Sequence, residues 1–218
     1  MPTESELTCE SGPCSWFEEE ARQRGYRVIA GLDEAGRGPL AGPVVGAAVI
    51  FPRRVDLAGL DDSKRVSPRA RDRLYEAVID RSLAWGIGIA SPREIDTLNV
   101  LQATRLAWRR ALDNLMVPPD FLLIDATTIP GVPTPQRAVV KGDQLSLSIA
   151  AASILAKVYR DRLMLTYHHQ FPAYRFDIHK GYPTSQHLRL LTEHGPCPLH
   201  RRSFRPLSHL EQSILEEV

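Results

Sequence analysis

Two apolar runs joined by a glycine-rich turn constrain the fold of this chain most strongly. Residues 26–32 (YRVIAGL) and 44–51 (VVGAAVIF) are rich in apolar and β-branched side chains, and the segment between them holds three glycines. Strand-like runs separated by a short turn of this kind are typical of an antiparallel β-hairpin. We therefore expect the two runs to pair and to form part of a sheet.

Helical and strand-like patterns alternate through the rest of the chain. The predicted strands cover 84–90, 120–125 and 136–140, and the predicted helices cover 15–25, 67–80, 99–116 and 145–167, with two shorter helices in the last fifty residues. Ser15 and Glu18 have the spacing of a capping box, and Ser67 followed by Pro68 resembles a helix start. This order predicts an α/β domain with a mixed sheet. We expect a flexible N-terminal tail (1–14), a core (15–168) and a small C-terminal helical lobe (169–218).

The charge balance gives little indication of a partner. The 27 Lys and Arg residues nearly cancel the 26 Asp and Glu residues. Bulk charge alone would not hold such a chain on nucleic acid, although a local basic groove is compatible with a balanced total. From Arg137 onward the chain has eleven Lys and Arg against seven Asp and Glu, so the C-terminal part is the more basic.

Cysteine usage and apolar segments indicate a cytoplasmic protein. Cys9, Cys14 and Cys197 form no C-x-x-C pair, so we expect reduced thiols, with a local Cys9–Cys14 bridge as the alternative. The first residues are polar and acidic, unlike a signal peptide. The longest apolar stretch, 39–51, is too short to cross a bilayer. We expect no membrane association, and the size permits a monomer.

Four carboxylates lie at or just after the ends of predicted strands: Asp33, Glu34, Asp125 and Asp143. Each also has a simpler interpretation, as a solvated turn, a strand-end residue or, for Asp143, a helix N-cap. Neighbours in a regular strand point to opposite faces, so Asp33 and Glu34 share a site only if the strand ends there.

Taken together, the four acids favour a metal site. Strand ends of one sheet can bring such side chains close, and oxygen ligands without nearby His or Cys suit Mg²⁺ or Mn²⁺ rather than Zn²⁺. Clustered carboxylates repel one another, and a bound cation neutralises them. The pattern predicts two-metal phosphodiester hydrolysis.

Several longer strings resemble the ribonuclease HII family, a type 2 ribonuclease H. They are GLDEAGRGPLAGPVV, LDDSKRVS, DTLNVLQAT, LLIDA, VVKGDQLSLSIAAASILAKVYRDRLM, HKGYPTSQH and HGPCPLHRRSF, and they cover roughly residues 26–206. The resemblance implies a ribonuclease H-like mixed five-stranded sheet with flanking helices and a small C-terminal helical lobe. It also implies that RNA/DNA hybrids and ribonucleotide-containing DNA duplexes are the partners, with Mg²⁺ or Mn²⁺ as cofactor.

The resemblance also implies residue roles. The metal-binding tetrad falls on Asp33, Glu34, Asp125 and Asp143, with Asp161 as the alternative to Asp143. The substrate-binding residues implied are Gly36, Arg37, Gly38 and Tyr182, which would recognise the 2′-hydroxyl group. The candidates for phosphate contacts are Lys64, Lys141, Lys157, Lys180 and the Arg201–Arg202 pair.

The implied reaction is hydrolysis of the RNA strand of a hybrid, including cleavage 5′ of a single ribonucleotide in duplex DNA. Metal-activated water would leave 5′-phosphate and 3′-hydroxyl ends. Two other functions would also account for the cluster of acids in this fold. One is an acid-cluster nuclease for DNA, such as a junction resolvase or transposase-type enzyme, and the other is a nucleic-acid-binding module without catalysis.

Overall fold

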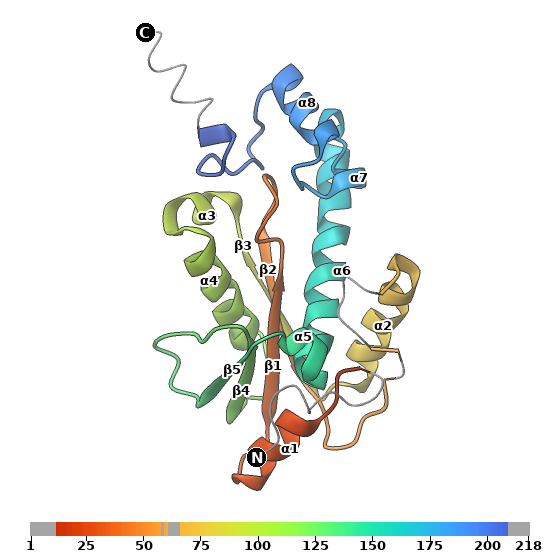
Figure 1. The fold of residues 1–218 in the computed structure, drawn as a ribbon, viewed down its shortest axis with the longest axis vertical. Coiled ribbons are helices and arrows are strands. Elements are labelled where there is room, and N and C mark those ends of the chain that lie inside the picture. Colours follow the sequence, from red (N-terminus) through yellow and green to blue (C-terminus); the bar gives the residue numbers. More distant parts are fainter. Residues whose placement is uncertain (1–11, 58, 61–65, 209–218) are drawn as a thin grey trace.

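The computed structural model describes residues 12–57, 59–60 and 66–208, in which helices flank a central sheet (Figure 1). The elements are α1 (Trp16–Gln23), β1 (Ile29–Ala35), β2 (Val44–Ile50), α2 (Pro68–Arg81), β3 (Ala84–Ala90), α3 (Pro92–Leu98), α4 (Val100–Asp113), β4 (Phe121–Asp125), β5 (Gln136–Val139), α5 (Gly142–Leu145), α6 (Leu147–Gln170), the 3₁₀ helix η2 (Pro172–Tyr174), α7 (Phe176–His179) and α8 (Ser185–His194).

The five strands form one mixed sheet in the order β3-β2-β1-β4-β5. The β1–β2 and β2–β3 pairs are antiparallel, whereas β1–β4 and β4–β5 are parallel. The predicted hairpin and the mixed five-stranded sheet are therefore confirmed. Because β1 lies at the centre, its end and the ends of β4 and β5 open at one edge of the sheet.

Strand β1 is shifted along the chain relative to the predicted run 26–32. The carboxylate of Asp120 accepts the main-chain N–H groups of Arg27 and Val28 at 2.8 and 2.9 Å, so these residues are held beside the start of β4 and outside β1. At its other end β1 continues to Ala35, which pairs with Val45. The two acids thus lie inside the strand rather than beyond it.

Helix α6 covers one face of the sheet and crosses β1 at very short range. A Cβ atom on Gly31 would lie 2.2 Å from the main-chain carbon of Ser148, so only glycine permits this approach. The apolar first half of α6 is buried, which agrees with the central packing expected of it. Helix α6 also runs beyond the sheet, and Figure 1 shows α7 and α8 gathered at its far end.

Helix α4 covers the opposite face and packs against β2 and β3 through a buried stripe that includes Ala107, Trp108 and Ala111. The predicted helix 99–116 is shorter in the structure. It is preceded by α3, which sequence reasoning missed although Ser91 and Glu94 form a capping box there. Asn99 ends α3 with a left-handed φ of 71° and caps α4, which separates the two helices.

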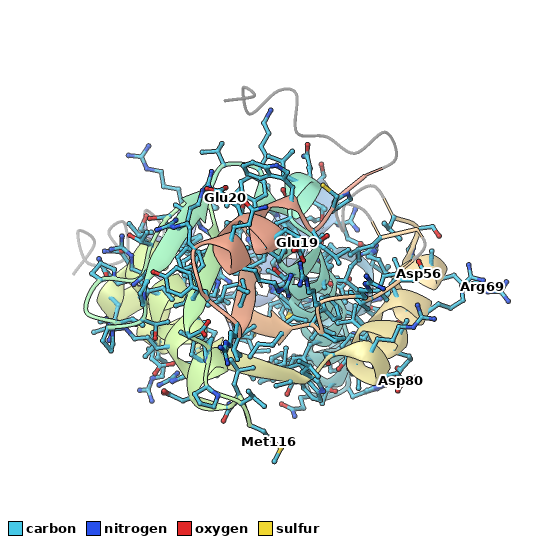
Figure 2. All side chains as sticks on the ribbon, turned by 90° about the horizontal axis from the view of Figure 1, so that it is seen from below. Glu19, Glu20, Asp56, Arg69, Asp80 and Met116 are labelled. Carbon is cyan, nitrogen blue, oxygen red and sulfur yellow. The ribbon has the colours of Figure 1, made fainter. Side chains whose placement is uncertain are left out.

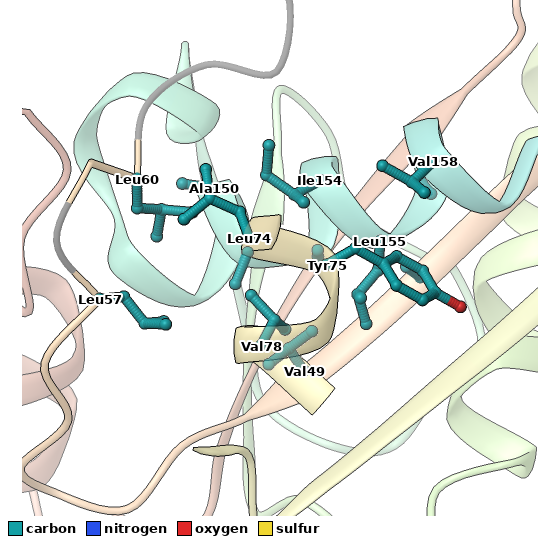
Figure 3. Close-up of a cluster of buried hydrophobic side chains, with 14 of the residues drawn as sticks. Val49, Leu57, Leu60, Leu74, Tyr75, Val78, Ala150, Ile154, Leu155 and Val158 are labelled. Atoms are coloured by element: carbon teal, nitrogen blue, oxygen red, sulfur yellow. The ribbon is translucent and has the colours of Figure 1, made fainter. Parts of the chain in front are cut away.

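Helix α2 packs on the outer side of α6. Its N-cap, Ser67, accepts from the N–H of Ala70, and Pro68 occupies the first turn as expected. Figure 3 shows Leu74, Tyr75 and Val78 of α2 directed toward the buried side chains of α6. The labelled Arg69 and Asp80 point outward from the same helix in Figure 2.

The predicted capping box of α1 is wrong. The side chain of Ser15 makes no cap hydrogen bond, and Glu18 is buried. Its Oε1 atom accepts from the hydroxyls of Ser146 and Ser148 and from the N–H of Ser148, at 2.6 to 2.9 Å. Glu18 therefore stabilises the start of α6, because a carboxylate at a helix N-terminus satisfies free N–H groups and favours the helix dipole.

Cys14, the last residue of the predicted tail, forms an isolated parallel bridge with Ser146. Residues 1–11, including Cys9, lie outside the described residues. Cys197 is a buried free thiol. Within the described part of the chain, no helix is long and apolar enough to cross a membrane. The division into tail, core and lobe remains a prediction.

Candidate active site

The four acids expected at strand ends line one open pocket of about 370 Å³. The lining residues are Asp33, Glu34, Ala35, Gly36, Arg37, Gly38, Asp125, Asp143, Ser153, Lys157 and Tyr182. The pocket therefore brings together residues that the sequence separates by up to 149 positions, from Asp33 to Tyr182. Of the predicted site residues, only Lys64 lies outside the described residues.

Asp33 and Glu34 reach this pocket from within β1, whereas the sequence predicted that the strand ends at these residues. The pairing of β1 with β4 ends where Leu32 lies opposite Ile124, whereas β2 remains paired with β1 as far as Ala35. The last residues of β1 thus border the open edge of the sheet. At that edge successive side chains line the same pocket although they alternate along the strand.

Asp33 is the most enclosed of these acids, with 6% of its surface exposed. Its Oδ1 atom accepts the N–H of Glu34 at 2.7 Å. Burial raises the pKa of Asp33 well above its usual value, and the charges of Glu34 and Asp125 raise it further, while a hydrogen bond from Ser153 opposes the shift. The site therefore carries concentrated negative charge that a cation would relieve.

Asp125 comes from β4, and Asp143 comes from the short helix α5, which follows β5. Asp125 is the last residue of β4, and its Oδ1 atom accepts the N–H of Gly142 at 2.8 Å. Asp143 lies within the short helix α5 and is 7% exposed. The N-cap interpretation of Asp143 is wrong, because the side chain of Ser146 caps α6 by accepting from Ile149.

Asp161, the alternative fourth acid, lies further along α6. Its carboxylate pairs with Lys157 at 2.7 Å and with Arg71 at 3.6 Å, and it does not line the pocket. Asp161 is thus engaged in one ion pair within α6 and one between α6 and α2. The structure places Asp143, and not Asp161, beside the other three acids.

The donor set suits a hard divalent cation. It consists of carboxylate oxygens, which Mg²⁺ and Mn²⁺ prefer, with no His or Cys in the lining. Among the residues described, no three His, Cys, Asp or Glu side chains are spaced to hold a metal ion by themselves. Protein sites usually bind Mg²⁺ through only one or two carboxylates, together with water and substrate phosphate.

The glycine-rich turn forms one wall of the pocket. Gly36 has a φ of +97°, and a Cβ atom there would lie 2.1 Å from Nε of Arg160, so both conformation and space require glycine. Arg37 is partly exposed, and its Nη1 atom lies 3.2 Å from Oε1 of Glu34. The turn therefore presents main chain and one cation to the pocket.

Tyr182 also lines the pocket and comes from the segment between α7 and α8. Its side chain is 40% exposed, which leaves the ring open to a ligand. Nζ of Lys157 and Cζ of Arg160 each lie 5.8 Å from the ring centroid. These cations lie within the range of a cation–π interaction and support the ring from the side of α6.

Ser153 was not predicted as a site residue, whereas Lys157 was predicted as a candidate phosphate contact. Ser153 and Lys157 lie four residues apart on α6, so they share one helix face, and both line the pocket. Burial lowers the pKa of Lys157, and the hydrogen bond to Asp161 opposes this shift. The available signal was a polar pair at i and i+4 within an otherwise apolar helix.

One expected phosphate contact is excluded. Arg201 is fully buried and donates to main-chain carbonyl groups, so it cannot reach a phosphate. Burial of Arg201 lowers its pKa to about 9, which still leaves it charged at neutral pH. Lys157 lines the pocket as noted, whereas Lys141 is exposed outside the lining.

A larger pocket of about 520 Å³ lies near α1 and the segment after β2. Its buried acid is Glu18, whose hydrogen bonds to Ser146 and Ser148 give it a structural role. The smaller pocket is therefore the candidate active site, because the clustered carboxylates, the glycine turn and the open tyrosine ring occur there.

Comparison with known proteins assigns the family. The family model described as "Ribonuclease HII" matches residues 30–207. A ribonuclease HII from Syntrophotalea carbinolica is 56% identical over 190 residues, which cover 87% of this chain and 91% of the relative. A second, from Geobacter sulfurreducens, is 50% identical and covers 94% and 95% of the two chains.

A solved structure agrees with this assignment. The crystal structure of the ribonuclease H2 from Pyrococcus horikoshii OT3 is 26% identical, with a TM-score of 0.71, and the match covers 87% of this chain and all of that one. The ribonuclease H-like fold expected from the resemblance is thereby confirmed. The chain belongs to the ribonuclease HII family, whose members are ribonuclease H endonucleases that cleave the RNA of RNA/DNA hybrids.

Proposed function

We propose that this protein hydrolyses the RNA strand of RNA/DNA hybrids and also cuts 5′ of single ribonucleotides embedded in duplex DNA, leaving 5′-phosphate and 3′-hydroxyl ends. The observation that carries the proposal is the shared pocket, in which the four carboxylates lie beside the Gly36–Gly38 turn and Tyr182. One part of this pocket suits phosphodiester hydrolysis and the other suits recognition of a sugar.

Asp33, Glu34, Asp125 and Asp143 would hold Mg²⁺ or Mn²⁺. Such ions, when bound, supply an activated water and stabilise charge on the phosphate during hydrolysis. The protein contributes the geometry. The N–H groups of Glu34 and Gly142 hold the carboxylates of Asp33 and Asp125 in fixed orientations. Orientation of this kind is the part of the chemistry that the protein can prepare before substrate binds.

The glycine turn and Tyr182 would recognise the ribonucleotide. Main-chain groups of Gly36 and Gly38 can approach a sugar closely because no side chain intervenes. The half-open ring of Tyr182 can stack on the adjacent sugar, and its hydroxyl can hydrogen-bond. Since the 2′-hydroxyl distinguishes RNA from DNA at a given position, these groups would provide selectivity.

Positive charge beside the pocket would hold the phosphate backbone. Arg37 is partly exposed at the rim and Lys157 lies in the lining. Contacts of this type fix the position of a duplex and carry no sequence information, which suits an enzyme that must act at any ribonucleotide. The proposed contact from Lys64 rests on the sequence alone.

A matched pair of substitutions tests the proposed metal site. Asp143→Asn removes an acid of the pocket, and Asp161→Asn makes the same chemical change at an acid of α6 that does not line it. We expect Asp143→Asn to abolish Mg²⁺-dependent cleavage of an RNA/DNA hybrid by the folded protein, and Asp161→Asn to retain cleavage. The reverse result would make Asp161 the fourth acid, and full activity in Asp143→Asn would contradict the proposed site.

A further inference from the structure

The guanidinium group of Arg201 is buried beneath the glycine turn. Its Nη2 and Nη1 atoms donate to the carbonyl oxygens of Gly36 and Arg37 at 2.5 and 2.9 Å, and Nε donates to Gly42 at 2.9 Å. The side chain is 0% exposed. One planar group therefore fixes the orientation of three peptide units in the turn.

The main chain around Arg201 holds the same turn against the lobe. The N–H of Arg201 donates to Leu40, and the N–H of Leu40 donates to Gly181, each at 2.8 Å. Ala41 and His200 form an antiparallel bridge. The residues after the glycine turn thus lie between the segment of Arg201 and the residue that precedes Tyr182.

A second set of hydrogen bonds runs from His200 to Tyr182. The N–H of Cys197 donates to Nδ1 of His200 at 3.0 Å, so the proton of neutral His200 is on Nε2. This Nε2 lies 3.1 Å from Nε2 of His187, and Nδ1 of His187 lies 3.0 Å from the carbonyl oxygen of Tyr182. His187 therefore accepts from His200 and donates to Tyr182.

The neutral state of both histidines agrees with their burial. Burial lowers the pKa of His200 to about 4 and also lowers the pKa of His187. Neutral imidazole has one donor and one acceptor nitrogen, which is what this chain of hydrogen bonds requires. With both imidazoles neutral, the N–H of Cys197 donates to His200, His200 donates to His187, and His187 donates to the carbonyl of Tyr182.

We propose that the His200–Arg201 segment is a positioning element for ribonucleotide selection: Arg201 holds the Gly36–Gly38 turn while His200, through His187, holds the main chain of Tyr182. This inference rests on the proposed function, because it concerns the two groups assigned there to the ribose. Neither residue lines the pocket, so both act through residues that do.

The choice of arginine follows from its geometry. A guanidinium group presents several donors in one rigid plane, whereas lysine presents a compact charge on a flexible stem. Burial of a charge is costly, and it is often no more stabilising than an apolar side chain of similar volume. The contribution specific to Arg201 is therefore the arrangement of the carbonyl groups of Gly36, Arg37 and Gly42.

The test measures recognition separately from chemistry. Two duplexes are compared in EDTA by fluorescence anisotropy, one with a single ribonucleotide and one with the corresponding deoxynucleotide, and the ratio of their Kd values gives the selectivity. We expect the wild type to prefer the ribonucleotide, and Arg201→Lys to reduce that ratio by about tenfold, which corresponds to about 1.4 kcal/mol. The control Arg189→Lys changes an exposed arginine of α8 and should keep the wild-type ratio.

The outcomes separate this inference from the proposed function. A wild-type ratio of one overturns the proposed ribose recognition itself. A wild-type preference that Arg201→Lys retains overturns only the positioning role. Melting curves identify the folded variants to which these comparisons apply.

A second pair of variants tests the histidine arm, and it also serves if Arg201→Lys does not fold. Asn at position 187 places an amide N–H near the position of Nδ1, whereas Gln places it near Nε2. We expect His187→Asn, which keeps the donor to Tyr182 and loses the contact with His200, to retain more of the selectivity ratio than His187→Gln, which loses the donor to Tyr182. If His187 only fills space, the two substitutions should change the selectivity ratio equally. Equal ratios for His187→Asn and His187→Gln would therefore overturn the proposal.

Discussion

The Nη2 atom of Arg201 lies 2.5 Å from the carbonyl oxygen of Gly36, although 165 residues separate the two in the sequence. This contact joins the C-terminal lobe to the turn that follows β1. The lobe also carries Tyr182, so the glycine turn and the tyrosine ring both depend on how the lobe packs. The arrangement leads to separate expectations for the acids, the tyrosine, the buried histidines and the start of α6.

Asp33→Asn should lower the cleavage activity without lowering the stability of the fold. The buried carboxylate of Asp33 lies among the charges of Glu34 and Asp125, which raise its pKa, so its ionised form destabilises the metal-free fold at neutral pH. Asparagine removes that charge and can still accept from the N–H of Glu34. We expect cleavage to fall at least about 100-fold, beyond the loss typical of residues around a metal ligand.

The melting temperature of Asp33→Asn in EDTA should equal or exceed that of the wild type. Hybrid cleavage and thermal unfolding of the same preparation provide both measurements. A large loss of stability with proportionate loss of activity would contradict the account, because it would make Asp33 a structural residue.

Substitutions at Tyr182 should separate its ring from its hydroxyl group. The ring is 40% exposed and supported by Lys157 and Arg160. Tyr182→Phe keeps the stacking surface, so we expect it to bind a ribonucleotide-containing duplex more tightly than Tyr182→Ala. Stacking of an aromatic side chain contributes about 1–3 kcal/mol in single-strand complexes, which sets the upper scale of the loss. Equal Kd values for the two variants would show that the ring makes no contact.

Buried histidines should make the fold sensitive to mild acid. Burial, and then the neighbouring His187, lowers the pKa of His179 and of His200 to about 4. In the unfolded chain each takes up a proton near pH 6.5. The unfolded state therefore binds more protons between pH 6.5 and 4, and stability falls as the pH falls through this window.

The expected slope is up to about 1.4 kcal/mol per pH unit for each histidine. Urea unfolding at pH 7 and pH 5 measures it, and His200→Gln should show a smaller loss of stability between these two values. His169→Gln is the control, because His169 is exposed. If the difference between the two pH values is the same in wild type and His200→Gln, the buried neutral state of His200 is wrong.

The neighbouring acids Glu18 and Glu19 should differ strongly in their effect on stability. Glu18 accepts from the hydroxyls of Ser146 and Ser148 at the start of α6, so Glu18→Ala leaves buried donors unsatisfied and should cost about 2–4 kcal/mol. Glu19 forms surface ion pairs with Arg22 and Arg53, so Glu19→Ala should cost less than about 1 kcal/mol. Urea titration compares them, and similar losses would contradict the capping role of Glu18.

The sequence predicted the sheet well because the residue patterns that specify its strands lie within the strands themselves. The β-branched runs of β2 and β3, and the Ser67–Pro68 start of α2, specify their own elements without distant partners. The exact start of β1 was not predictable, because it depends on a side chain about 90 residues away, Asp120. The role of Glu18 was missed for the same reason, since its partners are on α6.

The sequence predicted the acids of the pocket, but it did not predict the buried arginines that hold the main chain around it. Carboxylates after apolar runs are visible in the sequence, and the sheet order then brings them together. The buried positions of Arg160 and Arg201 were not visible, because a basic residue is usually exposed. Only the folded chain shows that these side chains satisfy carbonyl groups of the turns around the pocket.

The most direct test of the proposed activity is to map the cleavage site on a DNA duplex that contains one ribonucleotide, with Mg²⁺ and Mn²⁺ compared. The account predicts a single metal-dependent cut on the 5′ side of the ribonucleotide, with 5′-phosphate and 3′-hydroxyl ends, and an intact all-DNA duplex. Cleavage of the all-DNA duplex, or no cleavage of the ribonucleotide-containing duplex with either metal, would contradict it.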